Sequence, residues 1–180
     1  MYGIVNQAIQ GLVTEHFGEE TWQQVKAKSG LQEDLFLNNQ PYDDSITYSL
    51  AGAAAEVLGI PVHGVLVEFG KYWILTTSQK HYASLMQAGG HHLKEFMVNL
   101  PNFHSRVMLM YPELTPPEFK VSAVDENTME VHYYSQRDGL TGFMEGLLLG
   151  LGELYSVPVT VTITAQKANG ADHDVFLMQW

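Results

Sequence analysis

The sequence predicts an α+β protein in which a helical N-terminal region precedes a small antiparallel sheet. Through about residue 100, apolar side chains recur at three- and four-residue spacing, which is typical of amphipathic helices. After the Pro116-Pro117 pair the period shortens to two, and four strand-like segments follow. One long helical segment interrupts these strands, so we expect a four-stranded antiparallel sheet with a helix packed on it.

Six helical segments are expected before the sheet, and their ends carry start and stop signals. The third helix has candidate caps in Asp43, Asp44 and Ser45, and Gly59 and Pro61 follow its end. The expected helices cover residues 2–17, 19–28, 44–57, 61–73, 80–88 and 93–100. The expected strands cover residues 119–124, 129–137, 157–166 and 174–178, with a helix at 140–155 after the second strand and a turn at Asn169-Gly170.

Composition excludes several classes of partner and chemistry. The chain carries 20 acidic and 9 basic side chains, for a net charge of −11. A surface of that sign repels phosphate backbones and anionic headgroups, so nucleic acids and membrane surfaces are poor partners. There are no cysteines, which excludes disulfides and thiolate ligands.

No segment indicates targeting, membrane insertion or a familiar catalytic motif. The first residues lack the basic region and cleavage site of a signal peptide, and no apolar run approaches the roughly 18 residues of a membrane span. Neither a Gly-rich phosphate loop nor a hydrolytic triad is visible. We therefore expect residues 1–180 to form one soluble, cytoplasmic domain that is not an enzyme.

The segment TMEVHYYSQR, residues 128–137, carries the most specific pattern in the chain. In a strand, Tyr133, Ser135 and Arg137 share a face with the apolar Met129 and Val131. A buried arginine needs an anion, and two hydroxyls beside it suit two carboxylates on one rigid ligand. Periodicity alone leaves a second interpretation, in which the strand ends here and Arg137 is already at the surface.

His104 differs from the other histidines in its apolar surroundings. Pro101 is typical of the first turn of a helix, and Phe103, Val107 and Met108 then flank His104 on the apolar side. A neutral imidazole presented by an apolar helix face is typical of an axial haem ligand. A histidine in such a place is also found as an ordinary core residue, and the pattern by itself does not separate these two roles.

The helix expected at 140–155 combines a broad apolar face with a stripe of glycines. Gly142, Gly146 and Gly150 recur every four residues, and each glycine costs up to about 1 kcal/mol in a helix interior. A close neighbour is therefore expected along this stripe, and the stripe suits either close backbone packing, for example against the sheet, or a flat ligand. The apolar face comprises Leu140, Phe143, Met144, Leu147, Leu151 and Leu154.

Taken together, these features resemble the H-NOX family, the haem nitric oxide/oxygen-binding domains related to the sensor domain of soluble guanylate cyclase. The resemblance extends along the whole chain and is strongest to stand-alone cyanobacterial members. Its specific core is the Y-x-S-x-R signature at 133–137 with a histidine about thirty residues upstream. The other matching segments are MYGIVNQAI, FGKYW, NLPNFHSRV, PELTPPEF and GADHD.

The resemblance implies a haem b that lies between a distal helical lobe, residues about 1–60, and a proximal lobe, residues about 61–180. It makes His104 the iron ligand. It also implies that Tyr133, Ser135 and Arg137 hold the two propionates of the porphyrin. Pro117 matches the family's proline that presses on the porphyrin and bends it out of plane.

The resemblance also places three residues around the gas ligand. Phe143 falls where oxygen-binding members have a distal tyrosine, Trp73 lies on the distal side, and Leu147 is expected to contact the haem. Bound O₂ needs a hydrogen-bond donor, which is worth about 1.5–3 kcal/mol to a charged group, whereas NO and CO need much less. We therefore expect ferrous haem that binds NO and CO with little stable O₂ binding. The alternative is an O₂-binding protein in which the Trp73 indole is the donor.

The resemblance further implies that the domain signals in trans, because 180 residues leave no room for an output domain. The expected partner is a histidine kinase or a cyclic-dinucleotide enzyme, with a nucleotide cyclase less favoured. Two other functions are weighed beside this one. A peroxidase is disfavoured because no distal His/Arg pair is evident, and a haem-free module for an acidic apolar ligand would use the same strand.

Overall fold

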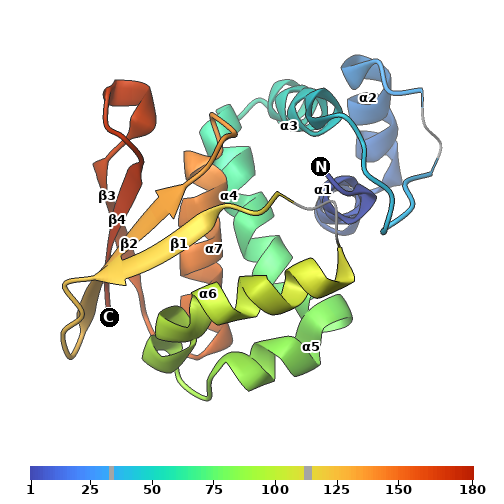
Figure 1. The fold of residues 1–180 in the computed structure, drawn as a ribbon. Coiled ribbons are helices and arrows are strands. Elements are labelled where there is room, and N and C mark those ends of the chain that lie inside the picture. Colours follow the sequence, from blue (N-terminus) through green and yellow to red (C-terminus); the bar gives the residue numbers. More distant parts are fainter. Residues whose placement is uncertain (33–34, 112–114) are drawn as a thin grey trace.

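The computed structural model describes residues 1–32, 35–111 and 115–180, and it confirms the predicted α+β fold. Figure 1 shows the sheet on one side, the helices within residues 3–58 on the other, and the helices Val62–Tyr72 and Thr141–Leu154 between them. The helices are α1 (Gly3–Phe17), α2 (Glu19–Ser29), α3 (Asp44–Leu58), α4 (Val62–Tyr72), α5 (Ser78–Gly89), α6 (Leu93–Met110) and α7 (Thr141–Leu154), with a π-helix at Trp73–Thr77 and a 3₁₀ turn at Lys167–Asn169.

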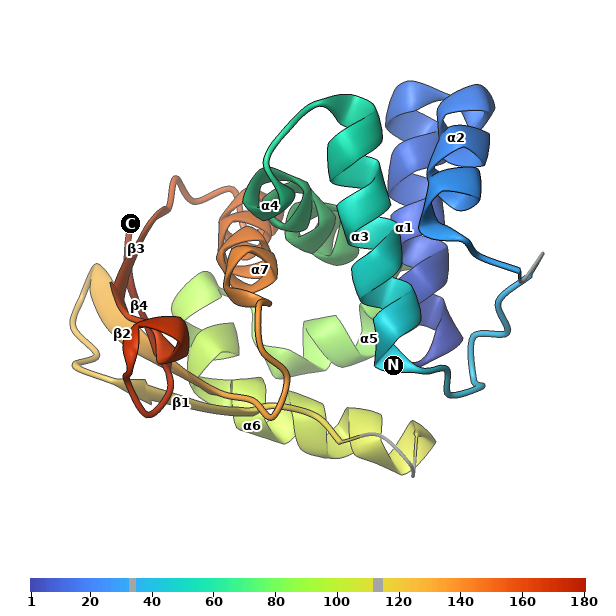
Figure 2. The same cartoon turned by 90° about the horizontal axis from the view of Figure 1, so that it is seen from above.

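The sheet has four antiparallel strands in the order β1-β2-β4-β3, as the sequence predicts. The strands are β1 (Glu118–Ser122), β2 (Thr128–Tyr134), β3 (Thr160–Ala165) and β4 (Asp174–Gln179). The central strand β2 alternates strictly between buried and half-buried residues, so one face of the sheet packs on the protein core and the other faces outward. Helix α7 lies against the buried face and separates the sheet from α4 (Figure 2).

The buried side chains form two clusters that meet near the end of α4. One cluster joins α5, α6, α7 and the sheet, and it includes the fully buried Phe96, Val131 and Phe176. The other joins α1, α2, α3 and α4. Val5 and Trp73 pack against both clusters, so these two side chains connect the two halves of the core.

The glycine stripe of α7 lies against helix α4. A Cβ atom at Gly146 would overlap the Val67 carbonyl, and one at Gly70 would overlap the Phe143 carbonyl on the opposite side of the same contact. Gly142 meets the backbone of His63 in the same way. The expectation of close backbone packing along the stripe is confirmed, and the neighbour is helix α4 and neither the sheet nor a flat ligand.

Helix α6 differs from the prediction because it continues through Pro101 to Met110. Pro101 was expected to begin a new helix, but it lies inside this one, where it removes one backbone hydrogen bond. The buried residues Leu93, Phe96, Met97 and Leu100 anchor the first half of the helix on the core. Packing of the helix therefore outweighs the tendency of proline to end a helix. A helix boundary predicted from the position of a proline does not take this packing into account.

No single helix in the described part of the chain is long and apolar enough to span a membrane. Helix α3 and the helical stretch from Val62 to Gly89 reach the required length and composition only together, as a pair bent by 112°. Both segments contribute buried side chains to the cluster that joins α1, α2, α3 and α4, for example Leu50 and Phe69.

The contact between α4 and α7 predicts opposite effects for two alanine substitutions. Gly146→Ala should destabilise the protein by about 1–3 kcal/mol, because the new methyl group forces the two backbones apart. Gly64→Ala in α4 is the matched control, because a Cβ atom at this position would meet open space. This substitution should stabilise the helix by up to about 1 kcal/mol. Urea unfolding measures both effects, and equal stability of the two variants would contradict the close packing.

Candidate ligand-binding site

An apolar cavity lies where α1, α6, α7 and the sheet meet the π-helix. Its larger part has a volume of about 210 Å³, and a smaller part of about 120 Å³ adjoins it. The two parts share Trp73, His104, Phe119, Met144 and Leu147, so they form one divided space. All the site residues predicted from the sequence line the larger part, namely Trp73, His104, Pro117, Tyr133, Ser135, Arg137, Phe143 and Leu147.

His104 presents its imidazole to this cavity from helix α6. Its Nδ1 lies 3.1 Å from the Leu100 carbonyl oxygen, which can only accept a hydrogen bond, so Nδ1 carries the proton. The ring stacks on Phe119 with centroids 4.8 Å apart. Burial lowers the pKa of His104, and the hydrogen bond to Leu100 only partly offsets this effect. The result is a neutral imidazole whose Nε2 lone pair is available to a metal ion.

Aromatic rings form the wall of the cavity opposite His104. Phe143 of α7 packs on Phe69 with centroids 4.7 Å apart, and Trp73 contacts both rings edge-on. The Trp73 indole donates no hydrogen bond within the described residues. This wall is apolar apart from that one N–H group.

Trp73 begins a π-helical turn that the sequence pattern does not reveal. The turn covers Trp73–Thr77, and the Ser78 N–H donates to the Trp73 carbonyl five residues earlier. A π-turn inserts an extra residue into a helix and is frequent at functional sites. Periodicity predicted a helix that stops at residue 73, because the extra residue shifts the apolar pattern after that position.

The polar residues of the cavity lie at the end of β2. Tyr133 is buried on the core face, but the strand ends at Tyr134 rather than at Arg137 as predicted. Ser135 Oγ accepts a hydrogen bond of 3.0 Å from the Arg137 N–H, which stabilises a turn instead of a further ladder bond. The single strand face expected for Tyr133, Ser135 and Arg137 is therefore wrong, although the turn brings all three to the cavity.

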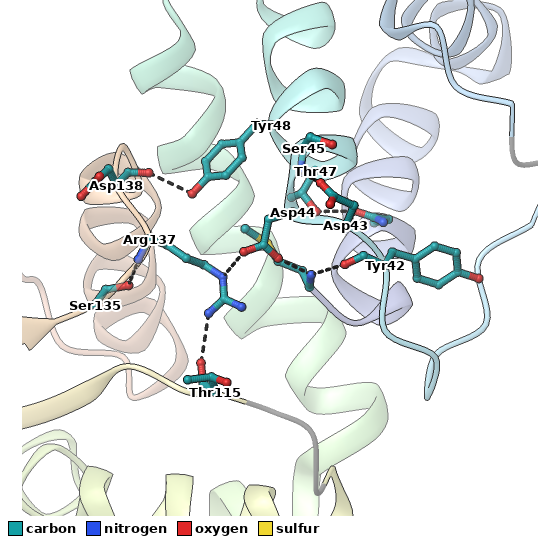
Figure 3. A network of polar contacts seen from close by, with 12 residues as sticks. Tyr42, Asp43, Asp44, Ser45, Thr47, Tyr48, Thr115, Ser135, Arg137 and Asp138 are labelled. Atoms are coloured by element: carbon teal, nitrogen blue, oxygen red, sulfur yellow. Dashed lines mark hydrogen bonds and ion pairs between the residues drawn. The ribbon is translucent and has the colours of Figure 1, made fainter.

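Arg137 connects three distant parts of the chain (Figure 3). Its Nε donates to Asp44 Oδ2 at 2.7 Å, and its Nη1 donates to the Thr115 carbonyl at 3.0 Å. Asp44, in the first turn of α3, also accepts a hydrogen bond from the amine of Met1. The guanidinium is only one-quarter exposed, so the interpretation that placed Arg137 at the open surface is not supported either.

The sequence did not identify Asp44 as the partner of Arg137. It indicated that this arginine needs an anion, but Asp44 was assigned only to helix capping, and the two residues are 93 positions apart. Burial would raise the pKa of Asp44, but hydrogen bonds from the Met1 amine and Arg137 outweigh it and hold the pKa below 3.8. Asp44 is therefore a carboxylate at neutral pH.

Hydrogen-bond donors remain available at the cavity after these contacts. Burial raises the pKa of Tyr133, so its hydroxyl stays protonated. The Ser135 hydroxyl accepts from the Arg137 N–H and also shares a hydrogen bond with the Tyr133 hydroxyl, so these two hydroxyls keep one hydrogen to donate. Arg137 has five N–H donors, and its side-chain bonds to described residues engage two of them. The site thus combines an apolar interior, one neutral imidazole and three donor side chains at one end.

An apolar slot with an imidazole on one wall and donors for carboxylates at one end is typical of haem-binding domains. A family model described as haem-NO-binding matches residues 2–163. The chain belongs to this haem-NO-binding, or H-NOX, family, whose members are haem-based gas-sensor domains and are not themselves catalytic.

Several soluble guanylate cyclases are similar in sequence. The chain is 25% identical to gcy-31 of Caenorhabditis elegans over 164 residues, which cover 91% of this chain and 23% of that protein. It is 27% identical to gcy-37 of the same organism over 188 residues, covering 99% and 27%. Soluble guanylate cyclase 89Db of Drosophila melanogaster is 22% identical over 164 residues, covering 91% and 24%. The chain spans about a quarter of the length of these relatives.

Solved H-NOX structures share the fold of this chain. An H-NOX protein from S. oneidensis in the Fe(II) ligation state, carrying a triple substitution, superposes with a TM-score of 0.90 at 20% identity, covering 99% of this chain and 95% of that one. The Fe(II) unliganded H-NOX protein from K. algicida gives a TM-score of 0.86 at 21% identity, covering 99% and 96%.

The Asp44 contacts predict a pH-dependent contribution to stability. Asp44→Asn should lower the free energy of unfolding of the haem-free protein by about 1–2 kcal/mol at pH 7, a modest value because the carboxylate is partly exposed. The folded pKa of Asp44 is lowered, so its contribution is complete above the ordinary pKa and is lost as the pH falls through the folded value.

Urea unfolding at pH 7 and at pH 3 measures this contribution. The difference between the wild type and Asp44→Asn should shrink at pH 3. Asp138→Asn is the control, because the Asp138 side chain is 81% exposed. This substitution should change the free energy of unfolding by less than about 0.5 kcal/mol. An Asp44→Asn effect that is equal at both pH values would contradict the network.

Proposed function

We propose that this chain is a haem-based NO sensor that binds haem b in the divided cavity, with His104 as the iron ligand. The observation that carries the proposal is the convergence of all the predicted site residues on one apolar space. In the bound form, ferrous haem supplies a coordination position for a diatomic gas. The residues of the chain then orient the haem, exclude water and select among gases.

The His104 ring already has the tautomer that iron binding needs, with the proton on Nδ1 and a free lone pair on Nε2. Its Nδ1–H group is engaged by the Leu100 carbonyl, which fixes the tautomer and the ring direction. The apolar neighbours Phe103 and Phe119 contact the ring. These contacts keep the imidazole neutral and exclude competing polar partners.

The other end of the proposed haem site is built to hold two acid groups. Tyr133 and Ser135 offer hydroxyl donors, and Arg137 adds a positive charge that the Asp44 contact holds in place. Pro117 and Leu147 line the same part of the cavity and would contact the faces of the porphyrin. Asp44 compensates the charge of Arg137 in this structure, and the N–H donors that Arg137 does not use there remain for an anionic ligand.

Selection for NO and CO over O₂ follows from the aromatic wall. Phe143 offers no hydrogen-bond donor to a bound gas, so the partial negative charge of bound O₂ is left uncompensated. The Trp73 indole is the one N–H group on this wall. An O₂-binding protein that uses Trp73 is therefore the second candidate function.

Signal transfer is proposed to follow the contacts of His104 and Arg137. Loss of the bond to His104 would release helix α6, and Arg137 links the site to α3 through Asp44. The domain would then shift between two packings of a distal lobe, about 1–60, and a proximal lobe, about 61–180. A cytoplasmic histidine kinase or cyclic-dinucleotide enzyme would read this shift in trans, and residues 1–180 would act as one domain.

The iron-ligand role predicts a specific loss and rescue. His104→Gly should not retain haem during purification unless imidazole is present, because a free imidazole can fill the space that the side chain leaves. Soret absorbance per protein, with and without imidazole, measures this. His91→Gly is the control, because His91 is exposed in a loop away from the cavity. Full haem retention by His104→Gly without imidazole would refute the assignment.

The proposed role of Phe143 predicts that a hydroxyl group added at this position raises the affinity of the ferrous haem for O₂. Phe143→Tyr should raise O₂ affinity by one to two decades, since a donor to bound O₂ is worth about 1.5–3 kcal/mol. Anaerobic and aerated spectra of the ferrous proteins give the measurement, with Phe143→Leu as the control without a donor. If the wild type already forms a stable O₂ complex that Trp73→Phe abolishes, the second candidate function is correct.

A further inference from the structure

Two histidines meet on the outward face of the sheet, on the side of β2 opposite the cavity. His132 lies between the buried Val131 and Tyr133 in the strand and therefore points away from the core. His173 immediately precedes β4, next to the residue paired with Tyr133. Both side chains are largely covered, with exposed fractions of 21% and 18%. The haem-sensor proposal assigns no role to this pair.

The two rings face each other through one nitrogen each. His132 Nδ1 lies 2.8 Å from His173 Nε2. The far nitrogens have oxygen partners: His132 Nε2 is 2.7 Å from Ser122 Oγ, and His173 Nδ1 is 3.3 Å from Asp172 Oδ2. Tyr134 stacks on His173 with ring centroids 4.0 Å apart and limits its rotation.

The oxygen partners determine where the protons lie. The Ser122 hydroxyl donates to Glu130 Oε2 at 3.1 Å, so it accepts from the Nε2–H of His132. The Asp172 carboxylate can only accept, so His173 carries its proton on Nδ1. Both facing nitrogens are then left with lone pairs directed at each other. One proton shared between the facing nitrogens accounts for the 2.8 Å contact, and a metal ion that binds here replaces that proton.

We propose that His132 Nδ1 and His173 Nε2 bind a divalent transition-metal ion. Two metal–imidazole bonds of 2.0–2.1 Å at the tetrahedral angle of zinc place the two nitrogens about 3.3 Å apart, so the rings separate by about 0.5 Å from the spacing found here when the ion binds. Ligating histidines typically donate their other N–H group to an oxygen acceptor, as both rings do. No group of three His, Cys, Asp or Glu side chains in the described residues could hold a metal ion, so water completes the coordination.

Nearby charges favour a cation on this face of the sheet. Glu130 Oε2 lies 3.9 Å from His132 Nε2, and Asp172 contacts His173. The neighbouring Lys120 lies over the Tyr134 ring and pairs with Glu118 at 3.0 Å, which offsets its charge. Imidazole ligands suit Cu²⁺, Ni²⁺ and Zn²⁺, with Cu²⁺ bound most tightly.

Zinc is the appropriate probe because it has no redox chemistry with ferrous haem. Untagged protein in the diamagnetic Fe(II)–CO form is titrated with ZnCl₂, and binding is followed by calorimetry and by ¹H–¹⁵N spectra of the histidine rings. We expect one equivalent of zinc, with shifts confined to Nδ1 of His132 and Nε2 of His173. The far nitrogens should remain protonated.

Single variants distinguish this site from other histidines. His132→Asn and His173→Asn should each weaken zinc binding at least about tenfold, because changes to the outer partners alone cost about 10–100-fold. His91→Asn is the matched control and should bind zinc as the wild type does. Far-UV circular dichroism and the Soret band verify that each variant is folded and loaded with haem.

The proposal is overturned if the wild type takes up no zinc, or if both single variants bind zinc unchanged. It is also overturned if the ring spectra of the wild type stay constant during the titration, which would mean that a shared proton alone holds the pair together. The readout involves neither gas binding nor the His104 ligand. Failure of the metal site and failure of the haem-sensor proposal are therefore distinguishable.

Discussion

The close approach of α4 and α7 is the constraint on which the ligand site depends. Glycines at the contact let the two backbones touch, as Gly70 and Gly146 do. The contact fixes Trp73 at the end of α4 against Phe143 of α7. A wider spacing would separate these rings and open the cavity to water, so helix packing and the shape of the cavity depend on the same small residues.

Periodicity predicted the order and type of the helices and strands because each element buries one regular face. It failed where a local rule competes with packing or with turn chemistry. Helix α6 continues through Pro101 because its first half is anchored in the core. The π-turn at Trp73 is invisible to any fixed period, since it consists of one additional residue in the helical turn.

The candidate site was predictable in composition but not in geometry. One cavity receives the side chains of Tyr133, Ser135 and Arg137. The turn that Ser135 stabilises directs them there, whereas the alternation of side chains along the strand does not. The role of Asp44 could not be predicted, because no local sequence pattern links this aspartate to an arginine 93 residues further along the chain. His132 and His173 illustrate the same limit, since only the strand pairing brings them together.

The π-turn also determines what a change in chain length would do at this place. A π-turn fits one more residue into a helical turn than α-geometry does. Deleting one residue between 73 and 77 would therefore restore regular α-geometry and leave α4 and α5 close to their present orientation. The change would fall on the ligand cavity, because Trp73 and Ile74 line it and would take new positions. The extra residue thus shapes the cavity wall and is not needed for the arrangement of the helices.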